Sequence, residues 1–146
     1  MKIAIGCDHR GYDLKKQIMD FLPGIEHTFQ DFGCYSTDSV DYPDIAKKVA
    51  GVVTSGEFER GILICGTGLG MSIAANKVKG IRAALCCDEL ASSRSRKHND
   101  ANILCLRGEG INTSSSLEIV KIFLSTAFEN GRHTRRLNKI TKLETS

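Results

Sequence analysis

Short apolar runs alternate with segments of helical periodicity along the chain, and this alternation constrains the fold more than any other feature. The runs expected to be strands are residues 2–7, 27–32, 61–65, 81–86 and 102–106, the second of which is the most polar. The segments expected to be helices are residues 12–21, 44–53, 71–78, 89–97 and 115–128. This order predicts an α/β fold of three layers, an αβα sandwich in which helices cover both faces of a five-stranded parallel sheet.

Two further boundaries complete this outline. Pro23 and Gly24 are expected to end the first helix. Gly131 separates the segment 115–128 from a basic helix at the C-terminus. The 146 residues are enough for one sizeable core and contain no internal repeat or linker, so we expect a single domain over residues 1–146.

Composition argues against several classes of protein. No stretch approaches the ~18 apolar residues of a membrane span. The apolar start of the chain stops at Asp8 and His9, which is not the pattern of a signal peptide. We therefore expect a cytoplasmic protein with reduced thiols. The six cysteines include no C-x-x-C pair, so most of them are expected to be small buried residues rather than disulfides or zinc ligands.

A loop rich in glycine follows the clearest strand, where ligands of parallel α/β sheets usually bind. Gly66, Gly68 and Gly70 follow Cys65 and precede a helix. Such a loop brings backbone N–H groups and the positive end of a helix to one place, which suits an anion. The alternative is a tight turn that needs glycine only for packing.

The spacing excludes three familiar anion loops. No lysine follows as in a nucleotide P-loop, and the third glycine comes one position too early for a dinucleotide fingerprint. Met71 stands where a cysteine phosphatase would have arginine. What remains is the Cys65 thiol beside a cradle of donors. A helix N-terminus favours the thiolate, which can act as nucleophile or base, while the donors can hold an oxyanion such as an enediolate.

Other polar residues stand at strand or helix ends. Asp8 and His9 follow the first strand, where Asp8 could bind a ligand or cap the next helix. Tyr42 lies in a polar loop whose Pro43 is typical of a helix start. His98 and Asn99 end a helix before the last strand, and a histidine there is a plausible acid or base or a solvated cap.

The C-terminal basic helix offers guanidinium groups on one face. Arg132 and Arg136 are four residues apart, which suits a phosphate clamp, although a solvated basic face is the alternative. The net charge of +3 is small and no aromatic residues are interleaved with the basic cluster, which argues against nucleic acid as a partner.

Five motifs in order resemble the type B ribose-5-phosphate isomerases. They are GCDHRGYDLK at 6–15, VDYPDIA at 40–46, GILICGTGLGMSIAANKVKGIRAAL at 61–85, HNDANIL at 98–104 and GRHTRRL at 131–137. The resemblance implies a Rossmann-like sheet of strand order 2-1-3-5-4. It also implies a metal-independent aldose–ketose isomerase of the pentose phosphate pathway that acts through an enediolate, without a cofactor. The family is dimeric or a dimer of dimers, with the site between two subunits.

The resemblance also implies a role for each candidate residue. Cys65 would move the proton between C1 and C2 of the sugar, and Thr67 would shuttle protons between the neighbouring oxygens. The backbone of the loop would stabilise the enediolate, through Gly66, Gly68 and Gly70. The remaining roles are furanose ring opening by Asp8 and His98, sugar binding by His9, Tyr42 and Asn99, and phosphate binding by Arg132 and Arg136.

Two positions bear on the subclass and the substrate. A branch of the family uses a glutamate near position 71, where this chain has Met71, so the cysteine branch fits. Many relatives carry glycine-x-arginine after the last strand, where this chain has Arg107-Gly108-Glu109. A carboxylate there could weaken phosphate binding, or Arg107 could substitute. The alternatives are therefore an isomerase of a hexose 6-phosphate such as allose 6-phosphate, and a binding module that senses a sugar phosphate without turnover.

Overall fold

The fold is an α/β sandwich built on one parallel sheet. The computed structural model describes residues 1–22 and 26–146, so the expected helix stop at Pro23 and Gly24 lies outside the described residues. The strands are β1 (Lys2–Cys7), β2 (Thr28–Asp31), β3 (Arg60–Cys65), β4 (Ala83–Leu85) and β5 (Ile103–Arg107). The helices are α1 (Tyr12–Phe21), α2 (Tyr42–Thr54), α3 (Leu69–Ala75), α4 (Glu89–Lys97), α5 (Thr113–Ser125) and α6 (Arg132–Leu143). All strand pairs are parallel, as the alternation of strands and helices predicted, and the order is β2-β1-β3-β5-β4, as the family resemblance implied.

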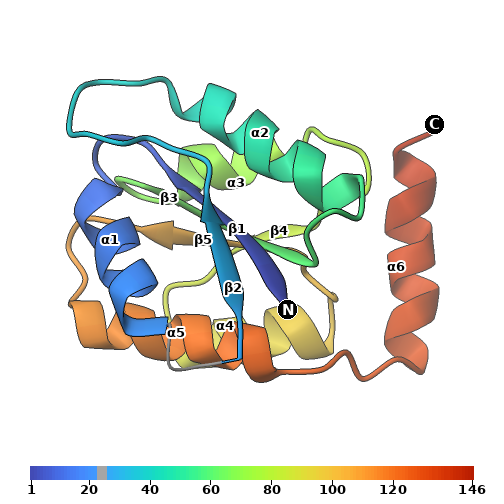
Figure 1. Cartoon of the computed structure of the whole chain (residues 1–146). Helices are drawn as coiled ribbons and strands as arrows, with labels where there is room; N and C mark the ends of the chain where they lie inside the picture. The colour runs from blue at the N-terminus through green and yellow to red at the C-terminus, as the bar shows by residue number, and fades with distance from the viewer. Residues whose placement is uncertain (23–25) are drawn as a thin grey trace.

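Helices α1, α4 and α5 cover one face of the sheet and α2 and α3 cover the other (Figure 1), and a buried apolar cluster lies on each face. Side chains alternate along each strand, so Ile62 and Ile64 pack on the face covered by α1 and α5. Leu63 and Cys65 pack on the opposite face with α2 and α3. Cys65 thus ends the central strand with its side chain on the α3 side, directly below the loop that leads into that helix.

The element boundaries differ from the expected ones by a few residues. The strand expected at 81–86 is only Ala83–Leu85, and at its N-terminal end side chains take the place of the backbone ladder. Asn102 Oδ1 accepts from the Arg82 N–H and Asn76 Oδ1 accepts from the Ala83 N–H, both at 2.8 Å. Asn76 also follows directly on α3, which is therefore shorter than the segment 71–78. Local side-chain bonds of this kind compete with regular structure.

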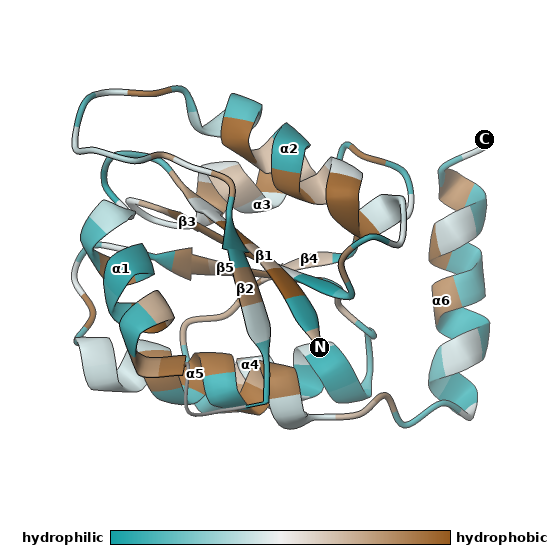
Figure 2. Ribbon diagram, viewed as in Figure 1, coloured by the Kyte–Doolittle hydropathy of each residue, from teal (hydrophilic) through white to brown (hydrophobic). Residues whose placement is uncertain are grey.

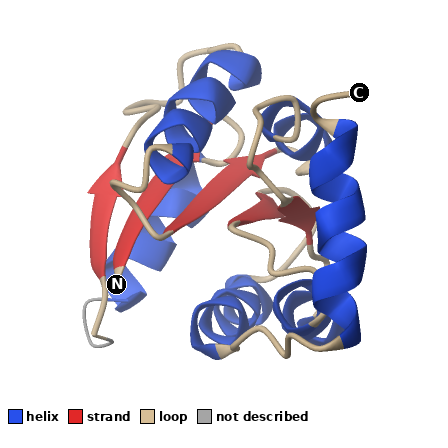
Figure 3. Ribbon diagram, turned by 90° about the vertical axis from the view of Figure 1, so that its right-hand side faces the viewer, coloured by secondary structure: helices blue, strands red, loops and turns tan. Residues whose placement is uncertain are grey.

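Helix α6 stands at the side of the sandwich. Figures 1 and 3 show it crossing from the layer of α4 and α5 toward the layer of α2 and α3. Its buried residues are His133 and Leu137, and Glu144 Oε1 accepts from the Gly80 N–H at 2.8 Å. Figure 2 shows α6 as largely hydrophilic with a few apolar turns. Among the described residues, no helix combines the length and apolar character needed to cross a bilayer.

Candidate active site

The loop after β3 presents donors that the protein itself does not use. The backbone N–H groups of Gly66, Thr67 and Gly68 donate to no acceptor in the described part of the chain. The loop is held in place by its carbonyls instead. Gly108 N donates to Cys65 O at 2.8 Å and Glu109 N donates to Gly66 O at 3.3 Å. Three consecutive unpartnered N–H groups beside a thiol form a site for negative charge.

Gly68 and Gly70 are required for this loop to close. Gly68 precedes α3 with a φ of +78°, a left-handed conformation that favours glycine. A Cβ on Gly68 would lie 2.5 Å from Leu85 Cδ1, and one on Gly70 would lie 2.6 Å from Tyr42 Cζ. The Tyr42 ring therefore lies against Gly70 at the start of α3. The tight turn by itself accounts for glycine at positions 68 and 70, and the binding of an anion by the free N–H groups stays a prediction.

We expect Gly68→Ala to destabilise the protein by about 2–4 kcal/mol, which combines left-handed strain with overpacking. The matched control is Gly56→Ala, because Gly56 has a φ of +81° but a Cβ there would meet nothing within 4 Å. Gly56→Ala should be destabilised only by the left-handed strain, which costs about 1–2 kcal/mol. Urea unfolding of both variants measures the difference, and equal losses would contradict a packing role for Gly68.

The residues after β1 are fixed by local hydrogen bonds. The buried Asp8 carboxylate accepts from the N–H groups of Arg10 at 2.9 Å and Gly11 at 3.1 Å, which orders the turn into α1. His9 Nδ1 accepts from the Val40 N–H at 3.3 Å. The neutral His9 ring therefore carries its proton on Nε2, as a donor for a ligand.

Of the six free cysteines, Cys65 is the one that ends a strand at the glycine loop. Burial raises the pKa of Cys7 to about 12, partly offset by Lys15, and raises that of Cys86 to about 11. Burial likewise raises the pKa of Cys105. These three thiols stay protonated at neutral pH, which makes them unreactive.

Glu109 lies beside the loop and is paired. Its carboxylate oxygens accept from Arg10 Nη1 at 3.2 and 3.3 Å, and both side chains are more than half exposed. The pair lies over the loop, since a Cβ on Gly66 would approach Arg10 Cδ to 3.0 Å and Glu109 Oε2 to 3.5 Å. A cavity of about 440 Å³ lies beside the loop, and its lining includes Gly66, Thr67, Arg107 and Glu109.

The other candidate residues form a second group at the opposite edge of the sheet. His98 and Asn99 lie between α4 and the start of β5, and Arg132 and Arg136 lie on α6. The strand register pairs Gly61 with Ile103 at the start of β5, and Cys65 with Arg107 at its end. The start of β5, which His98 and Asn99 precede, is therefore four residues, or ~13 Å, from Cys65 along the strand direction. One chain therefore does not bring the second group to Cys65.

The second group has its own structure. The rings of His98 and His133 stack with centroids 4.4 Å apart and an interplanar angle of 13°. His133 Nε2 lies 3.8 Å from Glu129 Oε2. Burial, together with the positive charge of Arg132 and Arg136, lowers the pKa of His133, which Glu129 opposes. The guanidinium groups of Arg132 and Arg136 have no partner among the described residues, which leaves them free for an anion.

Comparison with known proteins assigns the chain to a family. A model of the family described as Ribose/Galactose Isomerase matches residues 3–140. The chain belongs to the ribose/galactose isomerase family. Ribose-5-phosphate isomerase B of Escherichia coli is a relative with 43% identity over 143 residues, 98% of this chain and 96% of its own.

Two solved structures of the ribose/galactose isomerase family are closely similar. Ribose-5-phosphate isomerase B of Clostridium thermocellum shares 52% identity with a TM-score of 0.97, covering 99% of this chain and 98% of its own. The enzyme of Mycoplasma genitalium, solved with bound ribulose 5-phosphate, shares 43% identity with a TM-score of 0.93, covering 99% and 97%. The family resemblance read from the five motifs is thereby confirmed.

Glu129 and His133 were missed by the sequence analysis. Their spacing of four residues is visible in the sequence, but it spans the turn at Gly131 rather than one helix. His98 is 35 positions before His133 in the numbering, and only the packing of α4 against the segment 126–131 brings the two rings together. No local pattern signals that contact.

Proposed function

We propose that this chain is an aldose–ketose isomerase that interconverts D-ribose 5-phosphate and D-ribulose 5-phosphate. The observation that carries the proposal is the Cys65 thiol at the start of three unpartnered N–H groups, Gly66 to Gly68. The names of the E. coli and C. thermocellum relatives support the pentose phosphate as substrate.

The chemistry follows from this geometry. The Cys65 thiolate removes the proton from C2 of the open-chain aldose, and negative charge develops on the enediolate oxygens. The free N–H groups of the loop stabilise that charge as it forms. Thr67 moves a proton between the two oxygens, and Cys65 returns its proton to C1 to give the ketose. No atom is gained or lost in this sequence.

The active site is completed by a second copy of the chain. Arg132 and Arg136 lie on the helix whose His133 stacks on His98, near the amino ends of the strands, whereas Cys65 lies at their carboxyl ends. One chain therefore does not bring both arginines to the phosphate of a sugar bound at Cys65. Large apolar side chains are exposed on α3, which follows the glycine loop, and on α6, which carries the two arginines. The exposed fractions are 56% for Leu69 and 63% for Ile73 on α3, and 44% for Ile140 and 71% for Leu143 on α6. A cavity of about 640 Å³ lies between α6 and residues 76–84. We therefore propose a homodimer, or a dimer of dimers, that buries these surfaces.

In this dimer the roles divide between subunits. One subunit supplies the base and loop, with Asp8, His9 and Tyr42 around the sugar. Its partner supplies the second group: His98, with Asp8, for opening the furanose ring, Asn99 for a hydroxyl, and Arg132 and Arg136 for the phosphate. We also place the enzyme in the cytoplasm, where free thiols persist.

The test is conversion of ribose 5-phosphate by the purified protein in the presence of a chelator, with allose 6-phosphate in parallel. Efficient turnover of the pentose supports the proposal. Preference for the hexose would keep the mechanism and change the substrate. Saturable binding without product would leave only a sugar-phosphate-binding module.

The Arg10–Glu109 pair gives a prediction about affinity. Glu109→Gln removes a negative charge beside the loop and releases Arg10 for the anionic substrate. We expect the KM for ribose 5-phosphate to fall about two- to five-fold, the scale of an exposed ion pair of ~0.5–1 kcal/mol. Glu57→Gln, an exposed carboxylate in the turn before β3, is the control. A KM that is unchanged or higher in Glu109→Gln would refute this role.

A further inference from the structure

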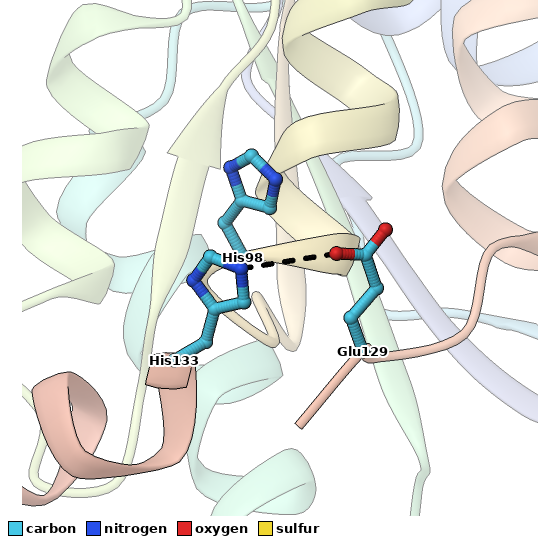
Figure 4. A group of neighbouring side chains, drawn as sticks. All are labelled: His98, Glu129 and His133. Carbon is cyan, nitrogen blue, oxygen red and sulfur yellow. Dashed lines mark ion pairs between the residues drawn. The ribbon is translucent and has the colours of Figure 1, made fainter. Parts of the chain in front are cut away.

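A cluster of three potential metal ligands lies outside the loop site. His98 follows α4, Glu129 lies in the segment before α6, and His133 is the second residue of α6 (Figure 4). One donor atom from each residue can be chosen so that all three lie within 4.8 Å of one another. The cluster therefore joins three parts of the chain at one point.

The backbone holds this cluster in position without help from a ligand. Glu129 N donates to Lys97 O at 3.1 Å, which places the carboxylate next to His98. Arg96 Nε donates to Thr126 O at 3.2 Å and fixes the start of the same segment on α4. Zinc binding therefore requires side chains to rotate but does not require the backbone to be ordered first.

We propose that His98, Glu129 and His133 bind a zinc ion. Two imidazoles and one carboxylate are a common zinc ligand set with a fourth position open to water or substrate. Two nitrogen donors favour zinc over magnesium or calcium, which prefer oxygen. Tetrahedral zinc with bonds of about 2.0–2.2 Å needs its donors roughly 3.3–3.6 Å apart. The ring planes of His98 and His133 differ by only 13°, whereas each ring must point a nitrogen lone pair at the ion, so the partly exposed His98 ring turns out of the stack as zinc binds. The Glu129 carboxylate, which is 49% exposed, turns toward the same ion.

The charges around the cluster permit a cation. The positive neighbours are Lys97, Arg132 and Arg136, all of which are exposed, so solvent and salt screen their repulsion. The Glu129 carboxylate supplies a negative charge within the cluster itself. His133 is 5% exposed, which keeps one ligand out of competition with bulk water.

Zinc at this position has a consequence for the isomerase, and this step rests on the proposed function. A zinc-bound His98 is not available to open the furanose ring of a sugar in the partner's loop site. The ion also adds positive charge beside Arg132 and Arg136 and restrains the start of α6. We therefore infer that zinc inhibits the enzyme reversibly by capturing His98.

Metal binding is tested first without any assay of activity. The full-length protein is titrated with Co²⁺, which reports ligand type by its visible spectrum, and with Zn²⁺ by calorimetry. Glu129→Gln is the test variant, because its side chain is half exposed and lies outside the proposed catalytic machinery. Glu57→Gln is the control. We expect one ion per chain. We also expect Glu129→Gln to bind the ion about 100-fold more weakly, because loss of a direct ligand should cost at least as much affinity as loss of a residue that only hydrogen-bonds to a ligand.

Two results would overturn the zinc site. One is a failure of the protein to bind either ion, and the other is equal binding by Glu129→Gln and the unmodified chain. If Cys65 or Cys87 bound the cobalt instead, a thiolate-to-cobalt band would appear in the near ultraviolet. Glu129→Gln would not change that band, so this outcome also counts as equal binding by the variant and the unmodified chain. Circular dichroism confirms that Glu129→Gln remains folded.

Inhibition is then measured with ribose 5-phosphate. Zinc should inhibit the unmodified chain and the Glu57→Gln control, a chelator should restore activity, and Glu129→Gln should need about 100-fold more zinc. Equal inhibition of Glu129→Gln would overturn the capture of His98. A chain without isomerase activity would refute the proposed function, and the cobalt and calorimetric titrations would still decide the zinc site.

Discussion

Replacing Cys65 with alanine is expected to lower kcat for ribose 5-phosphate by about 10²–10⁴-fold, the typical contribution of a general base. The change removes the thiolate but leaves the loop, whose shape depends on its glycines and on bonds from Gly108 and Glu109. KM should therefore change much less than kcat. Steady-state kinetics in both directions measures the loss.

The control for this substitution is Cys105→Ala. Cys105 is fully buried on β5, and burial raises the pKa of its thiol, so it takes no part in proton transfer. Cys105→Ala should keep a near-normal kcat. Exchange of solvent deuterium into C1 of ribulose 5-phosphate provides a second readout, because it needs enolisation but not ring opening. Exchange should disappear in Cys65→Ala, and a near-normal rate there would remove Cys65 from the mechanism.

A mixture of two inactive variants is expected to recover activity if the site lies between subunits. Cys65→Ala lacks the base, and the double variant Arg132→Ala/Arg136→Ala lacks the phosphate clamp. Loss of two charged hydrogen bonds of ~1.5–3 kcal/mol each predicts a fall in kcat/KM of roughly 10²–10⁴-fold. In a two-fold symmetric mixed dimer, one of the two sites contains no substitution.

Random reassociation gives about half mixed dimers, each with one intact site of two, so roughly a quarter of the full activity should return. The variants are unfolded together and refolded, with each variant refolded alone as the control. A mixture that stays as inactive as its components would show that base and clamp belong to the same chain. Sizing of the unmodified protein independently reports the dimer.

The parallel sheet was predictable because strands and helices leave separate periodic signals, whereas the strand order came only from the family resemblance. Ile62, Leu63 and Ile64 form a continuous apolar run, as a strand buried on both faces requires. The ends of elements were less predictable, because Asn76 and Asn102 bond to neighbouring backbone groups in a way that no apolar period reveals.

The candidate site was predictable only in its loop. Cys65 and the glycines that follow it are contiguous, so their chemistry can be inferred from adjacent residues. The position of Glu109 over Gly66 depends on the register of β3 and β5, and the stacking of His98 on His133 depends on where α6 begins. Contacts of that range are set by tertiary packing rather than by local sequence.

The two halves of the proposed site differ in how firmly they are attached to the fold. β3 has a paired strand on each side and a helical layer on each face, so its amides should open only when the whole domain unfolds. α6 is attached through Leu137, His133 and the bond from Gly80 to Glu144, so it can detach locally at a much smaller cost. In the proposed site, the phosphate would be bound by α6, which is attached to its own chain less extensively than β3 is. Release of the product would then require a movement of α6 and of its contacts with the partner subunit, while the loop after β3 would stay in place.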